Sequence, residues 1–406
     1  MGEKYTNIQN LSVSETLYKF INDEAIPGTN INKLKFWKGF DKALHKLTIR
    51  NKELIKIREK IQIDINSWHL NNRDKTFYQK NYYNFLKKIG YIKKVGNKFK
   101  IKTKNIDDEI SKIAGPQLVV PVMNARYVLN AANARWMSLY DSLYGTDVIE
   151  SEESASERYD PERGLEVRNY AKKFLDNNFT LVNDSWKNVT QITIDDKNLN
   201  LICGKNISKL KEKTKFIGYR GDKKKPTTVI LKNNNLHVEI IINPNAFNAK
   251  ADLAGISDII LESAITTICD HEDSVAAVDA KDKVLGYRNW LNLMNGSLVT
   301  NFEKSGKKLI RKLNTDRSYI SKDGSKLKLK GRSLLLNRNV GHLMTSPAIL
   351  LRDGSEAPEG IMDAFITTLC SLHDFKKNKN SKKNSIYIVK PKMHGVEEAE
   401  FTDEIF

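Results

Sequence analysis

Residues 116–136 read PQLVVPVMNARYVLNAANARW, an apolar run that passes directly into a polar segment. Residues 116–122 are short, apolar and β-branched, which predicts a buried strand. Asn124 can then cap a helix that starts directly after the strand. The segment carries three asparagines and two arginines, although asparagine is a poor helix former. The polar face of this helix therefore needs an explanation.

The polar residues of this helix gather on one strip. With 3.6 residues per turn, Arg126, Asn130 and Asn133 fall within about 60° of each other. The opposite strip is apolar and consists of Ala125, Leu129, Ala132 and Trp136. Ligands of parallel α/β folds bind beyond the carboxyl ends of the strands, so the polar strip is a candidate ligand site. The alternative is a buried hydrogen-bond network that ties the helix to its neighbours.

Apolar strands alternate with helical patterns through the rest of the chain. Helices are expected at 258–269 and 361–375. Further buried strands are expected at 274–279, 332–340 and 385–393. Continuous apolar strands separated by helices are typical of a parallel sheet covered on both faces. We therefore predict an α/β fold.

Two other regions have different patterns. Residues 1–110 read as helices, with apolar side chains at helical spacing in 36–47 and 77–89. From about residue 158, one helix is followed by short strands, and the three asparagines at 233–235 predict a hairpin. This indicates a separate α/β module inserted after the first strand and helix. Residues 397–406 read as the start of a further helix.

Length and composition restrict the class of protein. The chain has 406 residues, which suggests two or three domains at roughly 150 residues each. Its start lacks the apolar core of a signal peptide, and no apolar run is long enough to span a bilayer. Three cysteines, Cys203, Cys269 and Cys370, lie far apart, which favours reduced thiols. We expect a cytoplasmic protein that does not insert into membranes.

The formal net charge is +18, mostly from lysine. Basic runs such as 221–226 and 376–383 could bind nucleic acid. The runs are scattered, however, and lack the interleaved aromatic residues that stack on bases. A solvated lysine-rich surface is therefore the favoured interpretation, and nucleic acid is not an expected partner. Such a surface still attracts small anionic substrates weakly.

Two more expected strand ends carry polar residues. The stretch DHEDSVAAVD (270–279) offers a possible general base or metal ligands, or carboxylates that simply cap a helix. Arg338 follows the apolar residues 334–336, so its charge must either reach the open end of the sheet or be paired. His342 comes four residues later, and Gly341 permits a tight turn between them. Polar clusters at three strand ends favour one shared site.

Several familiar catalytic patterns are missing from the sequence. The spacing in 270–279 matches no zinc site. The chain has no GxxxxGK[ST] phosphate loop, no GxGxxG after a strand and no GxSxG elbow. These absences argue against a P-loop kinase, a dinucleotide dehydrogenase and an α/β-hydrolase.

From about residue 110 to 400 the sequence resembles the malate synthase G family. The resemblance rests on GPQLVVPVMNARYVLNAANARW, SLYDSLYGTD, EDSVAAVDAKDKVLGYRNWLNLM, GRSLLLNRNVGHLMTSPAIL, GSEAPEGIMDA and YIVKPKMHG. The match is long and ordered, and its motifs are specific. Met137 stands where the family pattern leads us to expect Gly, and Val396 where it leads us to expect Pro. Neither departure touches the expected chemistry.

The resemblance implies a (β/α)8 TIM barrel with an N-terminal helical clasp, an inserted α/β domain and a C-terminal helical plug. The expected parts are the clasp (1–110), the first strand and helix (111–136), the inserted domain (137–262 and 296–331) and further barrel segments (263–295 and 332–406). Only about four of the eight barrel strands are present. Half a parallel barrel leaves an unpaired edge and an open apolar face. We therefore expect a portion of a longer enzyme that is inactive alone.

The family condenses acetyl-CoA with glyoxylate to give malate and CoA, an acyltransferase reaction of the glyoxylate bypass. By motif, the residues expected to contact acetyl-CoA are Val119, Arg126, Tyr127, Ser274 and Arg311. Arg338 is expected to bind glyoxylate and to act in catalysis. The family uses Mg²⁺, whose ligands are expected beyond residue 406, so no metal ligand is assigned in this chain. A monomer is expected for the full-length enzyme.

Two alternatives remain open at this point. A binding module could have kept the CoA-contacting surface without catalysis, and it would show affinity for CoA with no turnover. A basic nucleic-acid binder would instead show salt-dependent retention on DNA and no response to acetyl-CoA. The roles of Glu272 and Asp273 are also undecided.

Overall fold

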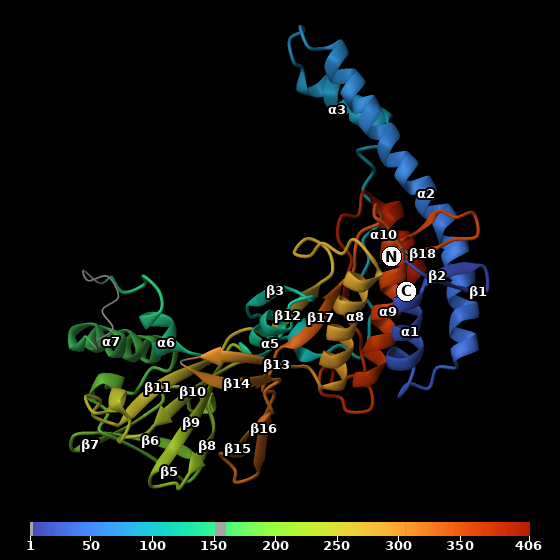
Figure 1. Cartoon of the computed structure of the whole chain (residues 1–406). Helices are drawn as coiled ribbons and strands as arrows, with labels where there is room; N and C mark the ends of the chain where they lie inside the picture. The colour runs from blue at the N-terminus through green and yellow to red at the C-terminus, as the bar shows by residue number, and fades with distance from the viewer. Residues whose placement is uncertain (1–2, 151–159, 305) are drawn as a thin grey trace.

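The computed structural model describes residues 3–150, 160–304 and 306–406 (Figure 1). Its centre is a parallel four-stranded sheet in the order β20-β17-β12-β3. These strands are β3 (Gln117–Pro121), β12 (Thr266–Asp270), β17 (Leu334–Arg338) and β20 (Ile388–Val389). Parallel strands joined through long crossovers confirm the predicted α/β fold.

Alternation of side chains divides this sheet into two faces. Ile268 and Leu336 lie on one face, in a small apolar cluster. Cys269 lies on the opposite face, in the main hydrophobic core. Asp270 and Arg338 lie two residues beyond Ile268 and Leu336, at the carboxyl ends of their strands, and therefore share the face of the small cluster.

Helices cover the face of the sheet that carries the main core. They are α5 (Ala125–Asn133), α8 (Ala280–Asn295) and α9 (Glu359–Ser371), the last followed by the short turn η5 (Leu372–Asp374). Apolar side chains from all three helices pack with Cys269 and Leu335 in one cluster. The predicted strand at 332–340 and helix at 361–375 are thus confirmed, with slightly different bounds.

Two predictions in the middle of the chain are wrong. Residues 258–269 were expected to form a helix but belong to β11 (Ile256–Glu262) and β12. The second strand of the sheet is therefore 266–270, and 274–279 is a loop in which Val278 is 74% exposed. The sequence TTIC of β12 is wholly buried, and a short apolar run of this kind does not distinguish a helix from a strand by periodicity. Its β-branched residues favour the strand.

The two outer strands of the sheet also differ from expectation. β3 was expected to be buried, but it lies at the edge of the sheet and Val119 is 48% exposed. The expected strand at 385–393 is reduced to the two residues of β20. Both differences have one cause, since each strand has only one neighbour in the described part of the chain.

The N-terminal region contains strands as well as the expected helices. β1 (Tyr5–Ile8) and β2 (Leu11–Ser14) form a sheet with β18 (Thr345–Leu350) and β19 (Glu356–Pro358). The short α1 (Glu15–Lys19) and η1 (Phe20–Ala25) follow and pack against α8. Residues from 15 to 26 join the main core, so this region is part of the body of the molecule.

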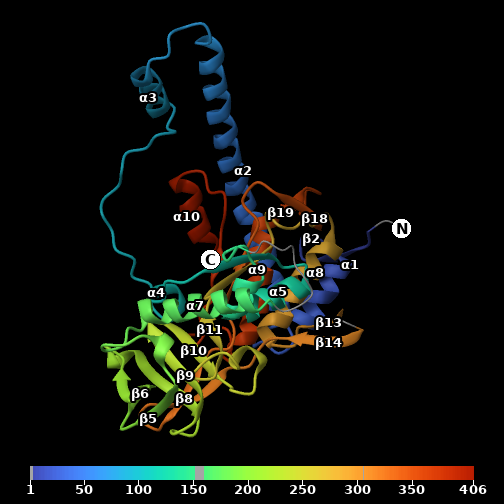
Figure 2. The same ribbon diagram turned by 90° about the vertical axis from the view of Figure 1, so that its left-hand side faces the viewer.

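A long helical arm comes next. α2 (Lys33–Asn71) begins on α9, where the rings of Phe40 and Phe365 lie 4.9 Å apart. It then extends away from the body and meets α3 (Gln79–Lys88), as both views show (Figures 1 and 2). Trp68 packs on Tyr82 and Phe85 near the tip, with ring centroids 4.6 and 5.7 Å apart. The chain returns through 93–104, which has no regular secondary structure, to α4 (Asp108–Ser111).

The remaining strands build a second body with its own core. A seven-stranded antiparallel sheet runs in the order β16-β15-β8-β9-β10-β11-β4. Its strands, besides β11, are β4 (Trp136–Ser138), β8 (Phe216–Gly221), β9 (Pro226–Asn233), β10 (Leu236–Ile242), β15 (Arg317–Ser321) and β16 (Lys326–Leu329). The predicted hairpin at 233–235 is confirmed, with positive φ angles at Asn234 and Asn235. This sheet draws strands from both sides of β12 in the sequence.

Smaller elements complete this second body. A three-stranded sheet consists of β5 (Gln191–Asp195), β6 (Asn198–Cys203) and β7 (Asn206–Lys209). The helices are α6 (Leu139–Tyr144) and α7 (Pro161–Asn178), with short turns η2 (Trp186–Asn188), η3 (Lys213–Lys215) and η4 (Phe247–Ala249). The hairpin of β13 (Val299–Lys304) and β14 (Lys307–Lys312) lies against α5, and α10 (Val396–Ile405) lies against α2. Within the described ranges, we find no helix with the length and apolar character needed to cross a membrane.

Candidate functional site

The centre of the candidate site is an ion pair between two neighbouring strand ends. Asp270 closes β12 and Arg338 closes β17, and the two residues are partners in the parallel register. Nε and an Nη of Arg338 each donate to a different oxygen of Asp270, both over 2.7 Å. This two-pronged geometry is the strong form of an arginine–carboxylate pair. Of the two alternatives for Arg338, an escape to the open end of the sheet or a paired charge, the structure shows the pair, with Asp270 as the partner.

The environment of Asp270 strongly favours its ionised form. Burial by itself raises the pKa of this carboxyl group, but hydrogen bonds from Arg338, from Ser274 and from two backbone N–H groups outweigh it. The net result is a pKa well below the usual range. Asp270 is therefore a fixed negative charge that orients the guanidinium group.

The loop after β12 adds further contacts. Ser274 Oγ donates to Asp270 over 2.7 Å. Glu272 accepts the N–H of Gly341 over 2.7 Å, and Lys392 Nζ donates to both Glu272 and Asp273 over 2.6 Å. Glu272 therefore ties the loop after β12 to the turn after β17. Asp273 is half exposed and lies 3.6 Å from the guanidinium group.

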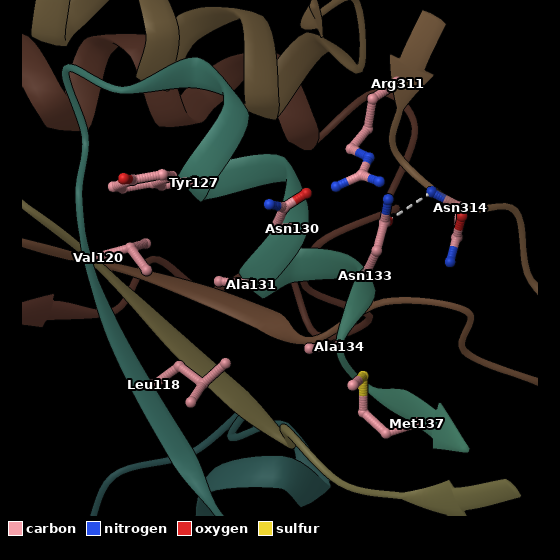
Figure 3. Close-up of a pocket in the computed structure, with 10 residues that line it drawn as sticks. All are labelled: Leu118, Val120, Tyr127, Asn130, Ala131, Asn133, Ala134, Met137, Arg311 and Asn314. Carbon is pink, nitrogen blue, oxygen red and sulfur yellow. Dashed lines mark hydrogen bonds between the residues drawn. The ribbon is translucent and has the colours of Figure 1, made fainter. Parts of the chain in front are cut away.

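Two cavities border α5, and the smaller of them reaches Ser274, a hydrogen-bond partner of Asp270. The larger, of about 700 Å³, lies between α5, β3 and β14 (Figure 3). Its lining residues are Leu118, Val120, Tyr127, Asn130, Ala131, Asn133, Ala134, Met137, Arg311 and Asn314. The smaller, of about 530 Å³, lies beyond the carboxyl end of β3 and is lined by residues 121, 123–126, 274–276 and 300.

The expected site residues fall into groups around these cavities. Tyr127 and Arg311 line the larger cavity together (Figure 3), whereas Arg126 and Ser274 line the smaller one. Ser274 is also bonded to Asp270, which joins the smaller cavity to Arg338. Val119 lines neither cavity, because its side chain alternates with those of its neighbours on the edge strand and points to the opposite face.

The polar residues of α5 do not line one common cavity. Arg126 lines the smaller cavity, whereas Asn130 and Asn133 line the larger one. Asn133 donates to the carbonyl of Lys312 over 2.9 Å and accepts the N–H of Asn314 over 2.8 Å, so it holds the end of β14 against α5. For Asn133 the network interpretation is therefore correct. The buried Oδ1 of Asn130 accepts no hydrogen bond from the described residues.

The second arginine of the opening stretch, Arg135, has a structural role that the sequence did not reveal. Its guanidinium donates to Glu109 and to Glu262, each over 2.8 Å, and is almost wholly buried. Glu262 also accepts from the ring of His237 over 2.5 Å. The network ties α4 to the seven-stranded sheet, and Arg135 and Glu262 lie 127 residues apart in sequence, which explains why local pattern could not identify it.

A second buried charged cluster also escaped sequence reasoning. Lys283 Nζ donates to Glu359 and Asp363 over 2.7 and 2.6 Å, and Tyr287 OH donates to Asp363 over 2.5 Å. All four side chains are buried between α8 and α9. The available signal was the presence of charged residues on the apolar faces of these two helices.

The carboxylates near Arg338 do not fit a metal site. Asp270 is occupied by Arg338, and Glu272 and Asp273 are occupied by Lys392. Among residues 3–150, 160–304 and 306–406 there is no group of three or more His, Cys, Asp or Glu side chains placed to hold a metal ion. No magnesium ligand is therefore assigned to the described residues.

Three sequence families match separate parts of the chain. The malate synthase N-terminal domain matches 16–77, the malate synthase G alpha-beta insertion domain matches 159–233, and the malate synthase TIM barrel domain matches 334–406. The last match includes Arg338. The parallel sheet is therefore part of a TIM barrel, and the insertion-domain match covers α7 and strands β5 to β9 of the second body.

Whole-chain similarity leads to the same family. The chain is 49% identical to a malate synthase G of Halalkalibacterium halodurans, an alignment that covers 100% of this chain and 56% of that protein. It is 47% identical to malate synthase G of Corynebacterium glutamicum and of Corynebacterium efficiens, over 98% of this chain and 54% and 53% of theirs. The chain spans about half the length of these curated relatives. The three domain matches and the whole-chain alignments point to the same family, so the chain belongs to the malate synthase G family.

Proposed function

We propose that this chain supplies the acetyl-CoA-binding and glyoxylate-binding residues of a malate synthase. The enzyme condenses acetyl-CoA with glyoxylate and hydrolyses the thioester to give (S)-malate and CoA. The observation that carries the proposal is the Arg338–Asp270 pair at adjoining strand ends, next to a cavity lined by Arg126 and Ser274. Ligands of TIM barrels bind at this end of the strands.

Arg338 is suited to the negative charge that this reaction develops. Removal of a proton from the thioester methyl group leaves an enolate, and its carbon attacks the aldehyde carbon of glyoxylate. Arginine has five N–H donors and stays protonated. The two donors bound to Asp270 fix the plane of the guanidinium group, and the others remain for the glyoxylate carboxylate and the enolate oxygen. Such a preorganised donor is typically worth about 2.7–4 kcal/mol in the transition state.

The two cavities suit the two ends of acetyl-CoA. The larger one offers the Tyr127 ring, apolar side chains of β3 and the Arg311 guanidinium, which match an adenine ring and its phosphates. The smaller one, with Arg126 and Ser274, lies nearer Arg338 and matches the acyl end. Val119 is proposed to contribute through its backbone, since its side chain lines neither cavity. The excess of positive charge adds a weak attraction for the anionic substrates.

Magnesium chemistry is proposed for the enzyme from its family alone. When bound, the ion would polarise a substrate oxygen as a Lewis acid. The carboxylates described around Arg338 are already paired with cations, so they take no part in that proposal.

The decisive experiment is a calorimetric titration of the purified 406-residue chain with acetyl-CoA. Saturable binding that weakens in Arg311→Ala and Tyr127→Ala, but not in the distant Arg50→Ala, would support the proposal. Absence of binding at about 1 mM acetyl-CoA, which corresponds to less than about 4 kcal/mol of affinity, would overturn it.

A second assay separates the enzyme from a CoA-binding module without catalysis. Because the chain alone is expected to be inactive, glyoxylate, Mg²⁺ and acetyl-CoA are added to a preparation that contains this chain together with the rest of the barrel, and released CoA is detected by its thiol. Release that depends on both additions and is lost in Arg338→Ala establishes the malate synthase activity. Binding without release in a preparation that contains the rest of the barrel would favour the non-catalytic module.

A further inference from the structure

The buried cluster between α8 and α9 lies directly behind the Arg338–Asp270 pair. Lys283 and Tyr287 belong to α8, and Glu359 and Asp363 belong to α9. The ammonium group of Lys283 lies between the two carboxylates, and Tyr287 donates to Asp363. Lys283 is 1% exposed, and neither Asp363 nor Tyr287 has measurable exposure. Because these side chains are closed to solvent, the cluster does not contact a substrate directly.

The cluster holds the turn that follows Arg338. Asp363 Oδ2 accepts the N–H of Val340 over 2.9 Å, and Lys390 Nζ donates to the carbonyl of Val340 over 2.5 Å. Both backbone groups of this residue are therefore bound to charged side chains, one of them the fully buried Asp363 and the other the partly buried Lys390. Gly360 makes this approach possible, because a Cβ there would lie 2.6 Å from the Val340 carbonyl oxygen.

The same cluster supports the strand end that carries Asp270. The ring of His271 lies against the ring of Tyr287, with centroids 5.4 Å apart, and His271 is 4% exposed. The backbone N–H of His271 donates to the carbonyl of Arg338 over 3.0 Å. Thus one buried cluster contacts the residue after Asp270 and the turn after Arg338.

We propose that Asp363, held by Lys283 and Tyr287, is a positioning residue that fixes the Arg338 guanidinium against Asp270. The inference rests on the proposed role of Arg338 for its meaning in catalysis, but the geometric claim stands without it. A buried ion pair is seldom the most stabilising choice, because apolar side chains of similar volume often serve stability as well or better. A positioning role explains why three charged side chains and a phenol are placed behind this one turn.

The test measures the protection of the turn and the environment of the Arg338 guanidinium separately, in the 406-residue chain and without substrate. Hydrogen exchange followed by mass spectrometry reports the amides of 337–344. The ¹⁵N-labelled arginine Nε–H signal of Arg338, assigned by its loss in Arg338→Lys, reports the pair with Asp270. In Asp363→Asn we expect exchange at the turn to accelerate by about tenfold or more. We also expect the Arg338 signal to shift or broaden.

Two further variants keep the test decisive. Tyr287→Phe removes one hydrogen bond to Asp363 with little change in volume, so it decides the question if Asp363→Asn does not fold. Lys172→Met is the matched control, because it removes another buried lysine, paired with Asp252 over 2.8 Å in the inserted domain. It should leave both signals unchanged while lowering stability.

An unchanged Arg338 signal in Asp363→Asn and Tyr287→Phe would overturn the proposal, even if both variants were less stable. Equal changes in Lys172→Met would overturn it as well, since the effect would then be general loosening. If the wild-type chain did not bind acetyl-CoA, the proposed function would be refuted. The exchange rate of the turn and the Arg338 signal would still test this inference, because both are measured without substrate. In an active enzyme, Asp363→Asn should lower kcat with little change in the KM for acetyl-CoA.

Discussion

Arg338 and Asp270 face each other across adjacent parallel strands, joined by two hydrogen bonds of 2.7 Å. Asp270 has no measurable exposure, so its charge depends on this partner and on the donors of the following loop. In return, the guanidinium group is fixed in one plane at the open end of the sheet. Each residue therefore determines the state of the other, which makes the pair the most informative target for mutation.

Arg338→Ala should destabilise the chain by about 3–5 kcal/mol, because it leaves the buried Asp270 carboxylate without its cation. Urea unfolding at neutral pH measures the effect. The double variant Asp270→Asn with Arg338→Met should recover much of the loss, since no unpaired charge remains. In an active enzyme, Arg338→Ala should also lower kcat by at least about a hundredfold.

A surface ion pair provides the matched control for that cycle. Lys46 and Glu404 lie 2.8 Å apart, but both are largely exposed. Lys46→Met should change the free energy of unfolding by no more than about 1 kcal/mol. A loss of that small size for Arg338→Ala as well would contradict the dependence of Asp270 on Arg338.

Tyr127→Ala and Arg311→Ala should each weaken acetyl-CoA binding by about tenfold, through loss of a stacking surface and of a phosphate contact respectively. Calorimetry at two salt concentrations separates the two effects. The Arg311 contribution should shrink at high salt because charge interactions are screened, whereas the Tyr127 contribution should not. Equal salt dependence of the two variants would argue against these separate roles.

Gly360→Ala should destabilise the chain by about 1–3 kcal/mol, because a new methyl group meets atoms that cannot move aside easily. A Cβ at this position would lie 2.3 Å from Lys390 Nζ and 2.6 Å from the carbonyl oxygens of Val340 and Gly341. Gly39→Ala in α2 is the control, since a Cβ there has no neighbour within 4 Å. It should stabilise the helix by about 0.5–1 kcal/mol, as measured by thermal unfolding.

Stability should fall as the pH is lowered from about 6.5 to about 4. Burial lowers the pKa of His271 and of His342 to about 4. In this window the unfolded chain binds protons at both residues and the folded chain does not, so acid favours unfolding. Above about pH 6.5 both states are neutral at these residues, and their contribution is constant.

Denaturation midpoints at several pH values between 7 and 4.5 test this dependence. His342→Gln removes one of the two groups and should make the decline shallower. An identical decline in wild type and variant would show that other groups, such as buried carboxylates, control the acid sensitivity.

Elements with a strong local signal could be predicted from the sequence. The strand at 116–122 with its cap at Asn124, the hairpin at 233–235 and the strand ending in Arg338 each follow from side-chain pattern or turn chemistry. Each is confirmed, although the first strand lies at the edge of the sheet and is not buried as predicted. β12 was missed because a five-residue apolar strand and a turn of buried helix have the same composition. As a result, the second strand was predicted to end at residue 279, whereas it ends at residue 270.

The contacts across the site could not be predicted, because they join residues far apart in the chain. Arg338 was expected either to reach the open end of the sheet or to be paired, and the sequence provided no means of choosing Asp270 among several carboxylates. The parallel register of β12 and β17 makes that choice. The division of the polar residues of α5 between two cavities likewise depends on the loops that pack around the helix. The structural role of Asn133 is shown only by its hydrogen bonds to residues at and after the end of β14.

The seven-stranded sheet has a consequence for how the protein emerges from the ribosome. β12 is translated about 145 residues after β3, its neighbour in the parallel sheet. At usual rates of synthesis, β3 therefore waits about 7–30 s for its first partner. β15 and β16 are translated later still, so neither sheet can be completed before the other is well advanced. Slowing translation between these strands should thus affect the yield of both bodies together.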